Sequence, residues 1–344
     1  MPAIPIEAAS RVRYPVPFSA AWYPPAVLAG VVEGRLTMHI TLLSRVIVFA
    51  AAYLILCGCQ MAAKEGVPDR YWSTRIEQWV SPQVLSEDAR DANYVLLGEI
   101  HDNPIHHDAQ GELILRLAEE GFIVGFEQLH LAQGEGLEIA LSSGDPLSEL
   151  PSRLAWDRSG WPPWSLYEPV FSAALQLEQA LIPLSFPSRK AFAVVSDGYS
   201  AVLPAEIIEG LGDALRFSPE ALKSLEAELA EAHCGKLPAT MLPGMATVQI
   251  ARDAHMAWRQ VEAGPKGILV VGGGHARRDR GVPRYLAQLQ PEGRSVVVLF
   301  LEERPGVPFP EGYPEAHASY ADYLALTPAA ERSDPCAQIE RRPE

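Results

Sequence analysis

Two short segments, far apart in the sequence, place histidine and carboxylate side chains at the ends of apolar runs. Gly98-Glu99-Ile100-His101 follows the apolar residues 94–97, and Gly272-Gly273-Gly274-His275 follows the apolar residues 267–271. A histidine with a carboxylate partner can act as a metal-free general base. Two histidines and a carboxylate can also hold a divalent metal such as Zn²⁺ and leave a position for water. The repeated Gly-x-x-His spacing therefore predicts one shared chemical site.

Other polar residues close to predicted strand ends extend this constellation. Glu127 follows the apolar residues 122–126, and Arg189 comes soon after the apolar residues 181–186. An arginine can hold an anionic group with two parallel hydrogen bonds. For hydrolysis, the candidate catalytic residues are Glu99, His101, Glu127, Arg189 and His275, and the candidate metal ligands are His101, Glu127 and His275. Structural alternatives stay open, since the histidines can be satisfied within the fold and Glu127 can cap the next helix.

The elements that must position these residues alternate between strand and helix. Apolar runs at 94–98, 122–126, 181–186, 267–271 and 295–301 read as strands, and helical patterns separate them. Asn103 and Pro104 suit the start of the first helix. Residues 198–243 predict a mostly helical insertion. The expected fold is α/β, with a mostly parallel sheet flanked by helices, which gathers the carboxyl ends of the strands at one edge.

An aromatic, proline-rich loop follows the second predicted strand. It contains Trp156, Trp161, Trp164 and Tyr167. These side chains can pin a long loop to the core. They can instead form the wall of a site for a flat apolar ligand, with a tyrosine offering its phenolate to iron.

Composition narrows the range of functions. The chain has 344 residues, of which 48% are hydrophobic, enough for a large globular core, and a formal net charge of −15. The negative net charge disfavours holding nucleic acid through its phosphates, so we expect no nucleic-acid partner. The four cysteines, at positions 57, 59, 234 and 336, show neither a CxxC motif nor a metal-binding spacing.

The N-terminal region predicts export and lipidation. The apolar run at 46–58 is too short to span a bilayer comfortably and suits a signal peptide. It ends in Leu56-Cys57-Gly58-Cys59, which is similar to a bacterial lipobox with Cys59 as the lipidated residue, held in the bilayer by acyl chains such as palmitate. Gln60 after this cysteine favours the outer membrane. An uncleaved N-terminal anchor is the alternative.

These observations divide the chain into five parts. We expect an unstructured upstream extension at 1–37, a lipoprotein signal peptide at 38–58 and a tether with a short helix at 59–90. An α/β domain at 91–302 and a surface C-terminal segment at 303–344 complete the chain.

The separated motifs resemble the ChaN-like haem-binding lipoproteins, which belong to a superfamily with the Tiki and TraB proteins and the erythromycin esterases. Coverage is about residues 70–330. The matching segments are 98–104 with His106, His107 and Gln110; Glu127; 159–162 through 167–169; 249–257; 272–277 with 281–283; and 321–323.

The resemblance implies a periplasm-facing, membrane-tethered protein that binds haem, serves iron uptake and can enclose the cofactor between two subunits as a homodimer. It implies a tyrosine as iron ligand, for which Tyr167 is the candidate. The other candidate haem contacts are His101, His106, His107, Trp161, Trp164 and Arg277. Relatives in the superfamily also use such histidines and the glutamate in metal-dependent peptide or ester cleavage, so a peptidase or esterase remains the alternative function.

Overall fold

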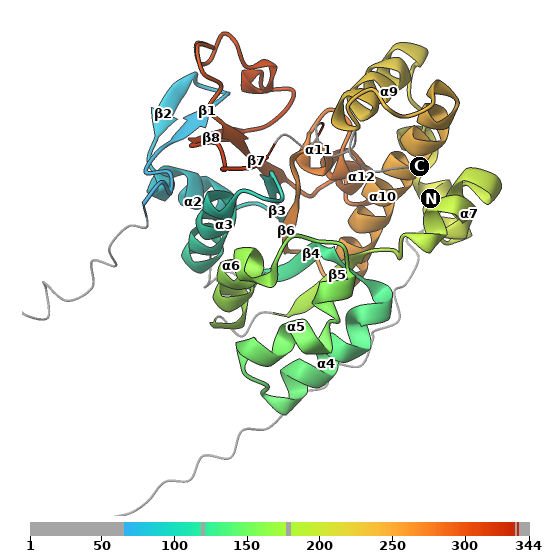
Figure 1. Cartoon of the computed structure of the whole chain (residues 1–344), viewed down its shortest axis with the longest axis horizontal. Helices are drawn as coiled ribbons and strands as arrows, with labels where there is room; N and C mark the ends of the chain where they lie inside the picture. Colours follow the sequence, from blue (N-terminus) through green and yellow to red (C-terminus); the bar gives the residue numbers. More distant parts are fainter. Residues whose placement is uncertain (1–64, 118–120, 177–179, 334–335, 337–344) are drawn as a thin grey trace, which may run out of the picture. The chain divides into compact units, whose positions relative to one another are not determined.

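The computed structural model describes residues 65–117, 121–176, 180–333 and 336, so the predicted extension, signal peptide and Cys59 lie outside the described residues. Within the described part, eight strands form one sheet in the order β2-β1-β8-β7-β3-β6-β4-β5 (Figure 1). The strands are β1 (Tyr71–Ser73), β2 (Gln78–Val80), β3 (Tyr94–Glu99), β4 (Ile123–His130), β5 (Leu181–Ser185), β6 (Gly267–Gly272), β7 (Ser295–Glu302) and β8 (Tyr323–Thr327).

The sheet is parallel except at one end. Neighbouring strands from β8 to β5 are parallel, whereas β1 is antiparallel to both β8 and β2. The central strand β3 lies between β7 and β6, and every residue of β3 and β6 is buried. Continuous burial is typical of parallel strands covered on both faces. The predicted α/β fold with a mostly parallel sheet is confirmed.

Helices cover both faces of the sheet (Figure 1). Alternate β3 residues divide the core, because Val95 and Leu97 join one apolar cluster and Tyr94 and Leu96 join the other. The first cluster contains residues of α2 (Pro82–Arg90), α3 (Pro104–Arg116), α4 (Gly134–Ser143), α5 (Leu150–Arg153) and α6 (Trp164–Gln176). The second contains residues of α8 (Ala205–Leu211), α9 (Pro219–Ala232), α10 (Leu242–Ala263), α11 (Gly273–Ala276) and α12 (Val282–Leu289). The helix α7 (Arg189–Asp197) packs against α10.

The start of α3 follows the sequence prediction. The Asn103 side chain accepts a hydrogen bond from the backbone N–H of Ile105, and Pro104 occupies the first turn. Gly111 then allows α6 to approach, since a Cβ atom there would lie 2.9 Å from the carbonyl oxygen of Pro169. This close contact fixes α6, and with it Tyr167, beside the end of β3.

Three strands depart from the sequence prediction. Residues 71–73 and 78–80 form β1 and β2 where a tether was expected, although the short helix expected there exists as α2. Residues 323–327 form β8 inside the sheet, so the expectation that 303–344 lies entirely on the surface is wrong. These strands are short, and their pairing joins the two ends of the domain, which local periodicity does not reveal.

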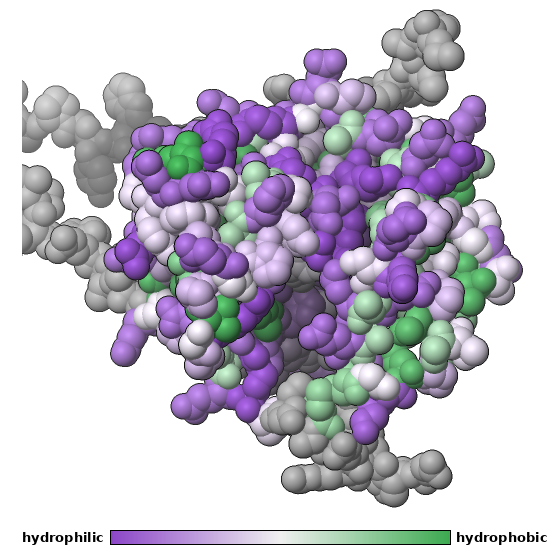
Figure 2. Space-filling model, turned by 90° about the horizontal axis from the view of Figure 1, so that it is seen from above, coloured by the Kyte–Doolittle hydropathy of each residue, from purple (hydrophilic) through white to green (hydrophobic). Residues whose placement is uncertain are grey.

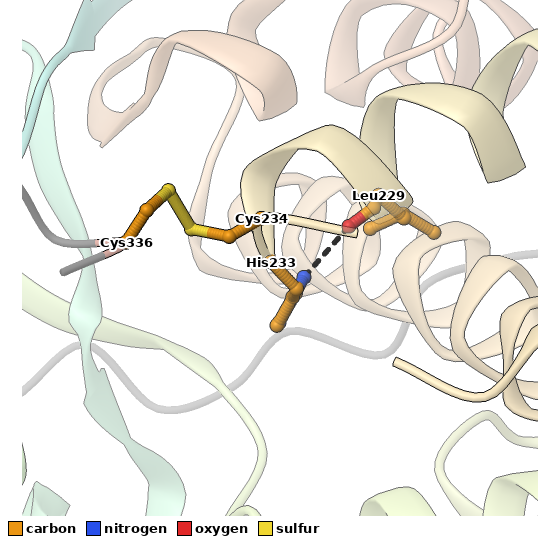
Figure 3. The surroundings of a disulfide bond; sticks show 4 residues. All are labelled: Leu229, His233, Cys234 and Cys336. Atoms are coloured by element: carbon orange, nitrogen blue, oxygen red, sulfur yellow. Dashed lines mark hydrogen bonds between the residues drawn. A yellow bond between two sulfur atoms is a disulfide. The ribbon is translucent and has the colours of Figure 1, made fainter. Parts of the chain in front are cut away.

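A disulfide bond joins Cys234, just after α9, to Cys336 near the C-terminus (Figure 3). The sequence separation is 102 residues. At the end of the same helix, Nδ1 of His233 lies 2.7 Å from the carbonyl oxygen of Leu229 (Figure 3). The bond ties the C-terminal segment to the helical insertion.

We expect the Cys336→Ser variant to lower the free energy of unfolding by about 2–5 kcal/mol, because the disulfide restricts a long loop in the unfolded chain. Thermal unfolding with and without reductant measures the effect. In the Cys234→Ser control, reductant should change nothing further. A wild-type melting temperature that is insensitive to reductant would contradict the assignment.

The face seen in Figure 2 is largely hydrophilic, in keeping with the net charge of −15. Figure 2 shows hydrophobic residues in small separate groups on the face in view, with a hollow near its centre. Among the described residues, no single helix is both long and apolar enough to cross a bilayer. One pair of helical segments, 189–201 and 205–215, is long and apolar enough when the two are taken together, but the pair is bent by 76°.

Candidate functional site

Glu99, the last residue of β3, is the centre of a buried polar network. Its Oε1 accepts hydrogen bonds from the Gln128 amide and the Tyr167 hydroxyl, each at 2.9 Å. Nδ1 of His101 lies 2.9 Å from the same oxygen, and Nε2 of His107 lies 3.2 Å from Oε2. Burial opposes ionisation of Glu99, but the two histidines hold its pKa well below the usual range. Glu99 is therefore a buried carboxylate anion.

Tyr167 does not occupy the position expected of an iron ligand. Its side chain is fully buried, and its hydroxyl donates to Glu99. Burial and the Glu99 carboxylate both raise the pKa of Tyr167. A phenol held in this way is neither accessible to haem nor prone to ionise, so the assignment of Tyr167 as ligand does not fit the structure.

A second polar network lies at the end of β6. His275 is placed between two carboxylates, with its Nε2 3.2 Å from Oε1 of Glu127 and its Nδ1 2.5 Å from Oδ1 of Asp253. The other Glu127 oxygen accepts a 2.7 Å hydrogen bond from the backbone N–H of Gly272. Gln249, one turn before Asp253 on α10, brings its amide nitrogen 3.0 Å from Nδ1 of His275. Asp253 thus positions this histidine, and Gln249 lies beside it.

The charges in this second network support one another. Burial disfavours the imidazolium, but Glu127 and Asp253 raise the pKa of His275 to about 10. In turn, burial opposes ionisation of Glu127, while His275 and His101 lower its pKa to about 2. For Asp253, burial outweighs the attraction of His275 and raises its pKa to about 6. Near neutral pH the Glu127–His275 pair is an ion pair, and His275 carries its proton.

His101 joins the two networks. Its imidazole lies against the backbone of Gly272, where a Cβ atom would be 2.9 Å from Nε2, so this position requires glycine. The opposite side meets Trp161 edge-on, with ring centroids 4.8 Å apart. Burial lowers the pKa of His101, but the hydrogen bond to Glu99 and the charges of Glu127 and Glu99 together outweigh this and raise it overall. The structure therefore brings His101, Glu127 and His275 together, as the two Gly-x-x-His strand ends predict.

A cleft of about 310 Å³ opens beside these networks. Glu127 and His275 reach it from the sheet, and Trp161 lines it from the aromatic loop. Ser188, which precedes Arg189 at the start of α7, also lines it. The cleft lies outside the carboxyl ends of the strands, where open parallel sheets bind their ligands.

Four predicted cofactor contacts serve other roles. His106 is buried; its Nδ1 accepts a hydrogen bond from the Ile100 N–H, and burial lowers its pKa to about 4. His107 is equally buried against Tyr167 and Glu99. Neither histidine reaches the surface, because the first turn of α3 faces the sheet rather than solvent.

The remaining two contacts lie away from the cleft lining. Trp164 packs on Trp156 and Phe171 in the core. Arg277 forms ion pairs with Glu228 and Asp279. Their interactions within the protein replace the cofactor contacts expected from sequence.

The predicted metal ligands do not form a ligand set. His101 is paired with Glu99, His275 is held between two carboxylates, and Glu127 accepts from the Gly272 N–H. In the part of the chain that the structure describes, no group of three or more His, Cys, Asp or Glu side chains is arranged to hold a metal ion. The metal-bound alternative of the site is therefore not supported.

Several residues at the site escape sequence reasoning. Gln128 follows Glu127 directly, and strict strand alternation would place the two on opposite faces. The pairing of β4 with β5 shifts register between Phe126 and His130. Such an irregularity re-aims side chains, and here Glu127 and Gln128 both line the cleft. Arg252 on α10 also lines it, and only its place within the 249–257 motif pointed to it.

These observations define a class of protein. It is an α/β protein with a buried histidine–carboxylate site at the carboxyl ends of its strands. The family model described as "Haem-binding uptake, Tiki superfamily, ChaN" matches residues 85–286. The chain belongs to this ChaN family of the Tiki superfamily. A comparison with curated protein sequences gives no match.

Among solved structures, one shares the fold, and two others give weaker superpositions. A structure titled "Cofacial heme binding to ChaN of Campylobacter jejuni" superposes with a TM-score of 0.61 and 20% identity, over 74% of this chain and 96% of that one. The type III effector HopBA1 gives a TM-score of 0.41 and 14% identity, over 72% and 94% of the two chains. A mutant of the erythromycin esterase EreC, in its open conformation, gives 0.39 and 19%, over 75% and 81%.

We expect the His275→Gln variant to lose about 3–5 kcal/mol of stability near pH 5–6, because the Glu127 carboxylate is left buried without its cationic partner. The folded-state pKa of His275 is raised from 6.5 to about 10, so its contribution is full below pH 6.5 and declines as the pH rises toward 10. The pKa of Glu127 is lowered in the folded protein, so a second contribution to stability is lost as the pH falls from 4.5 to about 2.

Chemical denaturation of the wild type and the variant across this pH range measures the difference. The difference in stability between the wild type and the variant should narrow at both ends of the pH range. A gap that stays constant from pH 5 to pH 10 would show that His275 carries no charge in the folded protein.

Proposed function

We propose that this protein binds haem on an exposed apolar surface formed by α7 and the start of α10. Family membership supports the ligand. The observation that carries the location is the exposure of Phe192, Val195 and Met241, which are 83%, 57% and 50% exposed. Val195 lies against Gly244, three residues after Met241, so the apolar side chains gather on one surface. An exposed apolar patch of this kind marks a binding site.

The chemistry of this surface fits a porphyrin. A flat macrocycle buries apolar area against Phe192 and Val195. Arg189, at the start of α7, offers a cation at the edge of the patch. Haem would supply its iron chemistry, and these residues would bind and orient it. A second copy of the chain covering the other side of the porphyrin would form the proposed homodimer.

Phe192→Glu and Val195→Glu should each weaken hemin binding about ten-fold or more, because a carboxylate must then lose water beneath an apolar ring. Titration of hemin into the full chain in detergent, followed by the Soret band, measures the affinity. Light scattering with and without hemin measures dimer formation. Val84→Glu is the matched control, since Val84 is also a half-exposed helical valine, 46% exposed, on α2.

Tyr167→Phe should retain hemin affinity, since its hydroxyl donates to Glu99. Equal hemin affinity in Val195→Glu, Phe192→Glu and Val84→Glu would refute the proposed surface. Absence of any Soret shift, together with an esterase or peptidase activity lost in His101→Ala, would favour the hydrolase instead.

Hydrolysis is the second candidate function, and one observation favours it. His101 keeps 38% of its side chain exposed while Glu99 accepts at its Nδ1, which is the arrangement of a general base oriented by a carboxylate. The proton that His275 carries makes it a donor rather than a base. In this reading His101 would activate water next to the cleft, without a metal.

We also propose that the protein is a lipoprotein anchored through Cys59, facing the periplasm from the outer membrane and serving iron uptake. The sequence of residues 56–59 supports the anchor. The Cys234–Cys336 disulfide supports the compartment, because such bonds persist in oxidising environments outside the cytosol.

In a Gram-negative host, Cys59→Ser should release the full chain from membranes or leave its precursor uncleaved, because the acyl chains attach to this thiol. Cys57→Ser, two residues away, is the control and should be processed as the wild type is. Fractionation and intact mass measure both. An unchanged mature mass with unchanged membrane partitioning would exclude lipidation at Cys59.

A further inference from the structure

Arg252 is the cation in the cleft with no carboxylate partner among the described residues. It projects from α10, and its guanidinium lies over the Phe186 ring, 5.0 Å from the centroid. By contrast, Arg277 and Arg280 both pair with Glu228, and Arg259 on the same helix pairs with Glu262. An unpaired guanidinium in a protein of net charge −15 points to an anionic ligand.

Two buried polar atoms reach the same cleft. The Ser185 hydroxyl and Oε1 of Gln128 have no hydrogen-bond partner within the described parts of the chain. Their residues are only 6% and 1% exposed, and both line the cleft. A buried polar group left unpaired costs about 1–3 kcal/mol, so a bound polar molecule stabilises this arrangement.

The walls limit what can enter. Trp161 and Phe186 give the cleft aromatic surface, and its volume is about 310 Å³, the lower end of the range for small-molecule sites. Glu127 is occupied by His275 and the Gly272 N–H, so it does not compete for Arg252. The cleft thus combines one available cation, one hydroxyl donor and an apolar wall, whereas Oε1 of Gln128 is an acceptor that cannot bond to an anion.

We propose that this cleft binds the carboxylate of a small molecule with an apolar body. Arg252 donates two hydrogen bonds to the carboxylate, the Ser185 hydroxyl donates a third, and the body lies against Trp161. This site is separate from the apolar surface of α7 and goes beyond the proposed haem binding. The carboxylate comes either from a free organic acid or from a haem propionate.

Calorimetric titration of the full chain in detergent with phenylacetate, and with the uncharged phenylacetamide, tests the proposal. Phenylacetate should bind at least ten-fold more tightly. Arg252→Gln should weaken phenylacetate about ten-fold or more and remove the preference over the amide, because a charge-assisted pair is lost. Ser185→Ala should weaken it several-fold. Arg259→Gln, two turns along α10, is the matched control and should bind as the wild type does.

Equal affinity for the acid and the amide, or unchanged binding in Arg252→Gln with a folded circular dichroism spectrum, would overturn the proposal. Repeating the phenylacetate titration with hemin already bound distinguishes a haem propionate from a free organic acid. If hemin competes with phenylacetate, the natural carboxylate is a propionate. If the two bind independently, the natural ligand is a free acid. Because the acid is measured without hemin, failure of haem binding leaves this result intact.

Discussion

Burial of two carboxylates on either side of β6 is the constraint around which this protein is built. Glu99 ends β3, and Glu127 lies near the end of β4. A carboxylate removed from water is costly unless donors and cations surround it. Glu99 obtains them from α3, α6 and β4, and Glu127 obtains them from β6 and its following histidine. The positions of these helices and of the aromatic loop therefore follow from the need to stabilise two buried carboxylates.

This constraint keeps the part of the family motif around Glu99 apart from the proposed ligand surfaces. The Tyr167 hydroxyl donates to Glu99 in the interior, and His107 lies against both side chains. Phe192 and Arg252 face outward or into the cleft, and they carry the properties that a ligand would recognise. Buried hydrogen bonds of this kind give rigidity, and that rigidity holds the neighbouring surface in shape. Any chemistry at this edge of the sheet therefore depends on side chains whose own contacts lie inside the protein.

Sequence reasoning reached the parts of the structure that local pattern controls. The strand ends at Glu99 and Gly272, the Asn103 cap and the convergence of His101 with His275 all follow from apolar runs and the geometry of parallel sheets. Family resemblance added the ligand class. The α10 residues Gln249 and Asp253 were recognisable as part of a motif. The sequence did not show that both of them lie against His275.

What sequence could not supply depends on tertiary contacts. Tyr167 sits in an aromatic-rich loop, where a surface role is as consistent with composition as a buried one; only the packing of α6 on Gly111 decides it. Gln128 reaches the cleft because strand pairing shifts register there. The disulfide joins cysteines 102 residues apart, a distance over which spacing carries no information.

The position of β8 has a consequence for how the polypeptide acquires its fold during synthesis. This C-terminal strand lies between β7 and β1, so the N-terminal strands β1 and β2 reach the sheet only through it. An emerging chain lacks that strand until residue 327 has left the ribosome. The edge of the sheet therefore closes last, over a large sequence separation that slows folding.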